Sequence, residues 1–189
     1  HRPHTVIGYA VGNAMNMGST LAVYATICRE TGRPFVFPGS PVQWNALTDL
    51  TDARQLARQL FWASTEAGGR NQAFNIVNGD VFRWKWLWPR LAEWFGIEAA
   101  PYPGHATSLE ETLAGDAELW ERIATKYGLA ESRIERLASA WHTDADLGRP
   151  VECVTDISKS RLAGFAGYQY TPDSFTDLFT RLRAEKLIP

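Results

Sequence analysis

The sequence is poor in cysteine and in long apolar runs, and both absences limit its class. Cys28 and Cys153 are the only cysteines among 189 residues, a pattern typical of reduced thiols rather than of a disulfide framework. No apolar run approaches the ~18 residues that a membrane-spanning helix needs. The formal net charge of −2 gives no electrostatic reason to expect nucleic acid or an anionic membrane as a partner. We therefore expect a cytoplasmic protein whose partner is a small molecule.

The sequence also lacks the short motifs of the common catalytic sites. Gly8 and Gly12 have the wrong spacing for a dinucleotide-binding loop, and no tyrosine is followed by lysine four residues later. There is no Gly-x-Ser-x-Gly nucleophile elbow. Only His1 and His4 have a spacing that metal ligands use. The chain by itself therefore predicts no catalytic residue and no metal site.

The hydrophobic periodicity predicts an α/β fold. Short strand-like runs lie at residues 5–9, 35–37, 74–77 and 152–155. Helical patterns cover residues 19–31, 53–65 and 131–141, and Asp49 and Asp52 are interpreted as helix-capping residues. Strands and helices alternate in residues 1–98, whereas residues 99–189 are mainly helical. We expect one compact unit with these two parts.

Tryptophan is abundant in one stretch, "NIVNGDVFRWKWLWPRLAEWFG", residues 75–96. Asp80 is the predicted cap of the helix that follows. One face of that helix is predicted to be apolar, with Trp84 and Trp88 in the core and Trp86 and Trp94 at its edges. The residues of this face are Trp84, Leu87, Trp88, Leu91, Ala92 and Phe95.

The Trp-rich stretch resembles the family of progesterone 5β-reductases and iridoid synthases, a branch of the extended short-chain dehydrogenase/reductases. The likeness extends to "HRPHTVIGYA" at the start, to "FPGSPVQWNALTD" and to "GFAGYQYTPDSFTDLF" near the end. The resemblance implies a Rossmann-like fold with few short parallel strands, NADP(H) as cofactor and a mainly helical substrate-binding part. It covers essentially the whole chain and is weakest over residues 99–145.

The same resemblance explains the missing motifs. In this family the Gly-rich loop and the catalytic Tyr and Lys precede the His-Arg-Pro strand, where this chain begins. We therefore expect the chain to be the C-terminal half of a larger reductase and to be inactive alone. No catalytic residue is carried over.

Some binding residues are implied by the resemblance. Pro3 and the backbone of Val6 correspond to positions that contact the nicotinamide, and Asn13 and Met15 to positions near the phosphates and ribose of the cofactor. His142 takes the place of an aromatic residue that points into the substrate pocket, which makes that pocket more polar.

The resemblance predicts a parent enzyme that transfers hydride to an enone or a similar activated C=C bond. Two alternatives stay open. One is a sugar-nucleotide epimerase or dehydratase of the same superfamily, for which Arg70, Arg83 and Lys85 are the candidate diphosphate ligands. The other is a non-catalytic module that binds a ligand or a partner. Homodimers are common in the superfamily, so a homodimer is a further expectation.

Overall fold

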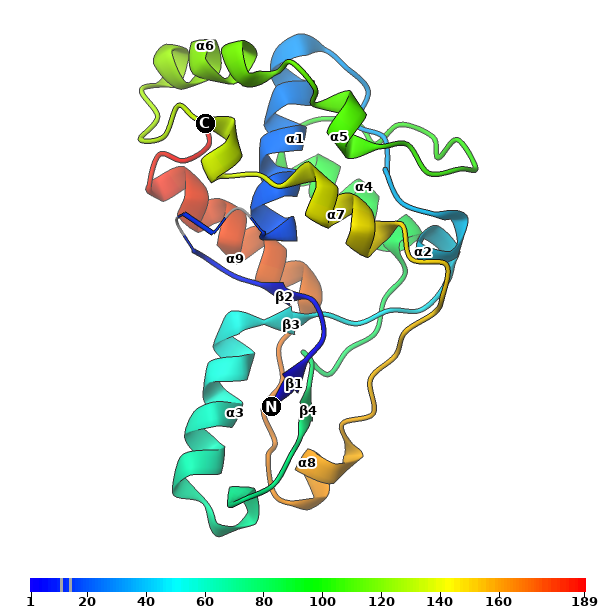
Figure 1. Cartoon of the computed structure of the whole chain (residues 1–189), viewed down its shortest axis with the longest axis vertical. Helices are drawn as coiled ribbons and strands as arrows, with labels where there is room; N and C mark the ends of the chain where they lie inside the picture. Colours follow the sequence, from blue (N-terminus) through cyan, green and yellow to red (C-terminus); the bar gives the residue numbers. More distant parts are fainter. Residues whose placement is uncertain (11, 14) are drawn as a thin grey trace.

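Helices make up most of the regular structure in this computed structural model, which describes residues 1–10, 12–13 and 15–189 (Figure 1). None of the helices in the described part of the chain has the length and apolarity to cross a bilayer. The elements in chain order are β1 (Arg2–Pro3), β2 (Val6–Ile7), α1 (Met17–Thr31), α2 (Pro41–Asn45), β3 (Thr51–Asp52), α3 (Ala53–Thr65), the 3₁₀ turn η1 (Ala67–Gly69), β4 (Asn75–Ile76), α4 (Trp84–Trp94), α5 (Leu109–Thr112), α6 (Ala117–Tyr127), the 3₁₀ turn η2 (Ile134–Arg136), α7 (Ala140–Leu147), α8 (Ser158–Leu162) and α9 (Thr171–Ala184).

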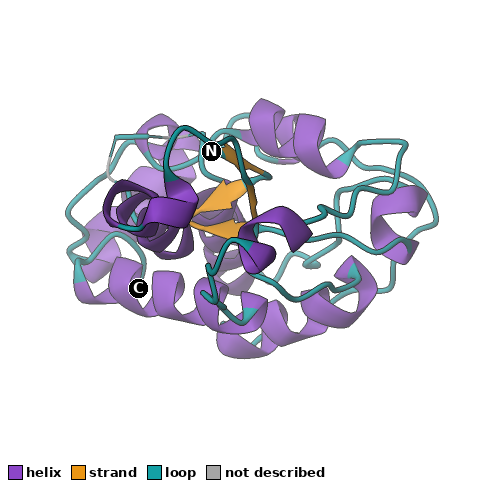
Figure 2. Ribbon diagram, turned by 90° about the horizontal axis from the view of Figure 1, so that it is seen from below, coloured by secondary structure: helices purple, strands orange, loops and turns teal. Residues whose placement is uncertain are grey.

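The strands are short and parallel, as the α/β prediction requires. β1 pairs with β4, with Arg2 opposite Asn75, and β2 pairs with β3, with Val6 opposite Thr51. The two pairs lie at the centre of the molecule with helices around them (Figure 2). β1 and β2 follow each other along one extended segment, so this segment is held by two different partners.

Two of the predicted strands are wrong. Residues 35–37 and 152–155 form only isolated bridges, Phe35 with Ala99 and Cys153 with Thr48. Pro34 and Pro38 enclose the first run, and proline has no N–H to donate to a ladder. The apolar residues of this run serve burial rather than strand pairing, because Phe35 and Phe37 lie in the aromatic core.

Helix α1 is the central element of the core. Every residue from Met17 to Cys28 is buried, so its sequence is apolar or small all round. The side chain of Asn16 caps its start by accepting from the N–H of Ser19 at 3.3 Å, and Gly32 ends it with φ 71°. Helix α9 packs on α1 and on α4, so elements from both predicted parts of the chain share this core.

The burial predicted for the Trp-rich helix is confirmed. All five predicted face residues within α4 are buried, as is Phe95 just beyond it, and Trp84 and Trp88 have exposed fractions of 1% and 0%. Trp86 and Trp94 are partly buried at its margin, as predicted. The Trp88 ring stacks on Phe35 with centroids 4.1 Å apart and donates its indole N–H to the Phe35 carbonyl at 3.2 Å. The cluster is therefore mainly core.

The predicted cap of this helix is wrong. Helix α4 begins at Trp84, and the carboxylate of Asp80 instead accepts hydrogen bonds from the Thr171 N–H at 2.8 Å and from its hydroxyl at 2.7 Å. Asp80 therefore holds the first turn of α9. Asp80 thus bonds to a residue more than ninety positions away instead of capping the helix that follows it. The local spacing of the sequence cannot reveal this contact.

The predicted helix over residues 131–141 is also wrong. A continuous helix needs the Glu131 carbonyl to accept the N–H four residues later, but this carbonyl accepts the indole N–H of Trp120 at 3.2 Å. The chain forms the short turn η2 there, and a helix starts only at α7. The shift places His142 in the first turn of α7.

Both cysteines are free, and they differ in burial. Cys28 is 2% exposed, and burial raises the pKa of its thiol to about 11, so at pH 8 only about one molecule in a thousand carries the thiolate. We expect iodoacetamide to modify Cys153 first and to reach Cys28 only when the protein unfolds. Peptide mass mapping at increasing urea concentration measures this order, and equal modification of both thiols in the folded protein would contradict it.

Candidate functional site

One hollow brings together several of the residues that the resemblance singles out. It has a volume of about 390 Å³ and is lined by residues from β2, from the segment before α1 and from α7. We call it the β2–α7 hollow; its lining residues are Thr5, Val6, Met15, His142, Ala145 and Asp146.

Three of the five predicted site residues line the β2–α7 hollow. Val6 and Met15 are 38% and 55% exposed, which is high for apolar side chains, and His142 lies opposite them on α7. Pro3 is exposed on β1 beside Ile76, and Asn13 is exposed in the segment before α1. Neither of the last two lines the hollow, and their cofactor roles stay predictions.

Helix α7 is held from three sides, which fixes the wall of the hollow. The Ser139 N–H at its start donates to the Thr20 hydroxyl of α1 at 3.0 Å. The Asp144 carboxylate accepts the N–H of Leu109 at 2.8 Å and so caps α5. At its end the Leu147 carbonyl accepts the N–H of Ser40 at 2.9 Å. His142 is thus presented by a rigid element.

His142 is not fully satisfied by the protein. Its Nδ1 atom is buried and has no hydrogen-bond partner in the described part of the chain. A buried polar atom without a partner is costly in a folded protein. His142 lines the hollow together with the apolar side chains of Val6 and Met15, while its Nδ1 atom is closed off from solvent.

A polar network that the sequence does not predict includes Thr5 and Asp146, two of the residues that line this hollow. The His4 ring contacts the Asp49 carboxylate through Nδ1 at 2.7 Å and the Arg149 guanidinium through Nε2 at 2.7 Å. Arg149 also pairs with Asp146 at 3.2 Å, and the Thr5 hydroxyl donates to Asp146 at 2.7 Å. The spacing of His142 and Asp146, one helical turn apart, is the one signal in the sequence that could have placed Asp146 at the site.

The helix-capping interpretation holds for Asp52 and is wrong for Asp49. The Asp52 side chain accepts the N–H of Arg54 at 2.8 Å at the start of α3. Asp49 caps no helix, because its carboxylate is occupied by His4 and by the N–H and hydroxyl of Thr155.

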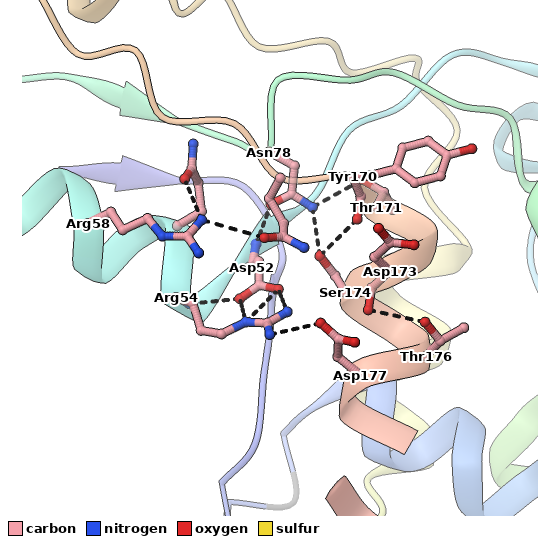
Figure 3. A network of polar contacts seen from close by, with 12 residues as sticks. Asp52, Arg54, Arg58, Asn78, Tyr170, Thr171, Asp173, Ser174, Thr176 and Asp177 are labelled. Atoms are coloured by element: carbon pink, nitrogen blue, oxygen red, sulfur yellow. Dashed lines mark hydrogen bonds and ion pairs between the residues drawn. The ribbon is translucent and has the colours of Figure 1, made fainter. Parts of the chain in front are cut away.

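A second hollow of about 260 Å³ lies between α3 and α9, and three of its charged groups, Asp52, Arg54 and Asp177, pair with one another. Figure 3 shows the Arg54 guanidinium between the carboxylates of Asp52 and Asp177, at 2.6 and 2.9 Å. Burial works to raise the pKa of Asp52, but the hydrogen bonds from Arg54 outweigh it and hold this pKa below its ordinary value. Arg181 stacks on the Tyr9 ring at 3.7 Å. The charged groups of this second hollow are therefore engaged with one another or with the Tyr9 ring.

Asn78 occupies the centre of the same region and connects three elements (Figure 3). Its side-chain oxygen accepts the N–H of Asp52 at 2.6 Å, and its amide donates to the hydroxyls of Thr171 at 3.0 Å and Ser174 at 3.3 Å. Asn78 is fully buried. The Asn-Gly-Asp segment after β4 therefore fixes α9 against the start of α3.

The candidate diphosphate ligands do not gather at a hollow. Arg83 and Lys85 both contact Asn45, at 3.3 and 3.4 Å, between α2 and α4. Arg70 follows η1, a few residues beyond the end of α3. None of the three lines the β2–α7 hollow. Among the described residues no group of three or more His, Cys, Asp or Glu side chains is arranged to hold a metal ion.

Comparison with known proteins identifies the family. The model of the PRISE-like Rossmann-fold domain matches residues 1–189. The chain is 36% identical over 191 residues to an (S)-8-oxocitronellyl enol synthase of Nepeta cataria and 38% identical over 190 residues to that of Antirrhinum majus. It is 37% identical over 191 residues to a 3-oxo-Delta(4,5)-steroid 5-beta-reductase of Arabidopsis thaliana.

Each of these alignments covers 100% of this chain but 49% of the relative. The chain thus spans about half the length of the curated relatives it matches. The family match covers every residue. The parallel strands with helices around them agree with the Rossmann fold that the family's description names. This chain belongs to the PRISE-like Rossmann-fold family.

Proposed function

We propose that this chain is the C-terminal, substrate-side portion of an NADPH-dependent short-chain reductase that reduces the C=C bond of an enone. The observation that carries the proposal is the β2–α7 hollow, where Val6, Met15 and His142 come together. The names of the relatives agree with it, since one is a steroid 5-beta-reductase acting on a 3-oxo-Delta(4,5) steroid, which contains an enone. The two free cysteines fit a reducing compartment such as the cytoplasm.

The residues of the hollow fit a nicotinamide. In the proposal the ring lies against the apolar side chains of Val6 and Met15, and the carboxamide bonds to the backbone of Val6, because an amide offers both a donor and an acceptor. Pro3 and Asn13 flank this position along the chain. When bound, NADPH supplies the hydride.

His142 faces the substrate in this proposal. A substrate carbonyl or hydroxyl would lie beside the His142 ring, which lines the hollow. A tyrosine from the preceding half of the reductase would stabilise the enolate oxygen, since this chain carries no Tyr-x-x-x-Lys pair. The chain alone is therefore proposed to be inactive.

The test compares the longer protein, expressed from the source gene, with the 189-residue chain. We expect the longer protein to oxidise NADPH in the presence of members of an enone panel and the 189-residue chain to show no turnover. A longer protein that ignores every enone but converts a UDP-sugar with NAD⁺ would favour the epimerase alternative. Binding of the same ligands without any turnover would favour the non-catalytic module.

A further inference from the structure

We propose that Asp146 determines specificity in the β2–α7 hollow, by accepting a hydrogen bond from a hydroxyl group on the substrate. This inference rests on the proposed function and deepens it, because it names a chemical feature of the enone. Asp146 lines the hollow together with His142, one turn earlier on the same face of α7.

The Asp146 carboxylate is held in one orientation. Thr5 donates its hydroxyl to one oxygen at 2.7 Å, and the Arg149 guanidinium lies 3.2 Å from the other. A carboxylate has about four lone-pair sites, so two such contacts leave acceptor sites for a ligand. The side chain is 14% exposed, and Asp146 is one of the residues that line the hollow.

His4 and Asp49 keep Arg149 in place. Arginine can only donate hydrogen bonds, so its contact with His4 Nε2 at 2.7 Å requires that nitrogen to be an acceptor. The proton of the neutral ring then sits on Nδ1 and is donated to Asp49, which is 1% exposed. Asp49 is itself fixed by the N–H and hydroxyl of Thr155. Asp49, His4 and Arg149 are thus positioning residues for Asp146.

The charges of this network favour a donor group in the ligand. With His4 neutral, the network holds the two carboxylates of Asp49 and Asp146 and the single guanidinium of Arg149. The excess is negative, so an anionic substituent at this place would be repelled. A hydroxyl fits this environment, because it is uncharged and can donate a hydrogen bond to Asp146.

The experiment uses the longer protein and two probes of nearly equal size, 4-(hydroxymethyl)cyclohex-2-enone and 4-ethylcyclohex-2-enone. We expect kcat/KM for the hydroxymethyl probe to exceed that for the ethyl probe by about tenfold or more, as a hydrogen bond to a charged acceptor requires. In Asp146→Asn this preference should fall several-fold, with most of the change in KM. Equal rates for both probes, or a preference that Asp146→Asn leaves intact, would overturn the inference.

Asp156→Asn is the control, because it makes the same change in an exposed carboxylate that accepts the Ser158 N–H at 2.7 Å and does not line the hollow. It should leave the probe preference unchanged. Arg149→Lys keeps the charge but loses the fork that reaches both His4 and Asp146, so it should reduce the preference without abolishing reduction of the ethyl probe.

A binding measurement separates this inference from the proposed function. The dissociation constants of both probes are determined from the ¹³C-methyl shift of Met15 in the presence of NADP⁺, which needs no turnover. If no enone is reduced but the hydroxymethyl probe binds about tenfold more tightly, the proposed reaction fails and the assignment of Asp146 stands. If both probes bind alike, the assignment fails whatever the activity.

Discussion

Replacement of Trp88 by alanine is expected to destabilise the protein by about 3–5 kcal/mol, which is the usual cost of deleting a buried aromatic side chain. Trp88 is 0% exposed, stacks on Phe35 at 4.1 Å and meets Phe37 edge-on at 5.3 Å. The change also leaves the Phe35 carbonyl without the indole donor. Since a domain of this size is stable by about 5–15 kcal/mol, the variant should lose a large share of its stability. Urea unfolding followed by circular dichroism measures the difference.

Trp86→Ala is the control for this prediction, because it removes the same side chain from the same helix. Trp86 is only partly buried, and its ring packs under the Arg90 guanidinium at 3.9 Å. We expect a loss of about 1 kcal/mol from an exposed contact of this kind. Equal losses for Trp86 and Trp88 would show that the helix is oriented differently from the structure described above.

Asn78→Ala is expected to cost about 2–4 kcal/mol, because it removes three hydrogen bonds at a fully buried position. The N–H of Asp52 would lose its acceptor, and the hydroxyls of Thr171 and Ser174 would lose their donor. With these bonds lost, the segment after β4 would no longer be held to the starts of α3 and α9. Hydrogen exchange should therefore report faster exchange of the Asp52 amide and of the first turn of α9.

Asn75→Ala makes the same replacement three residues earlier, in β4, and provides the comparison. Its amide makes one exposed bond, to the Asp156 carbonyl at 3.0 Å, so the expected cost is within about 1 kcal/mol. If Asn78→Ala were as mild as Asn75→Ala, the network in Figure 3 would not hold α9 in place.

Much of the helical structure follows from the sequence, because periodicity and capping act locally. Helix α3 begins after Asp52 and ends at Thr65, and α4 buries the face that its apolar spacing predicts. The errors arise where a distant group takes a local hydrogen bond. Trp120 takes the Glu131 carbonyl and Thr171 takes the Asp80 carboxylate, and neither competition is visible in local spacing.

The candidate site was predictable only in part. The resemblance to the family selected Val6, Met15 and His142, which line one hollow, and also Pro3 and Asn13, which lie outside it. Asp146 and its supporting residues were missed, because His4, Asp49 and Arg149 come from three separate segments. These residues come together because β2 pairs with β3 in parallel. No single residue of the sequence indicates that pairing.

The proposed position of the cofactor can be tested directly with Met15 and Met17, the two methionines of this 189-residue chain. Met15 lines the hollow and is 55% exposed, whereas Met17, two residues later, is 1% exposed in the core. The measurement is an NADPH titration of the longer protein with ¹³C-methyl methionine, in which Met15→Leu and Met17→Leu assign the two resonances. If the cofactor lies as proposed, the Met15 resonance shifts in a saturable manner and the Met17 resonance moves little. Saturable NADPH binding that leaves the Met15 resonance in place would contradict it.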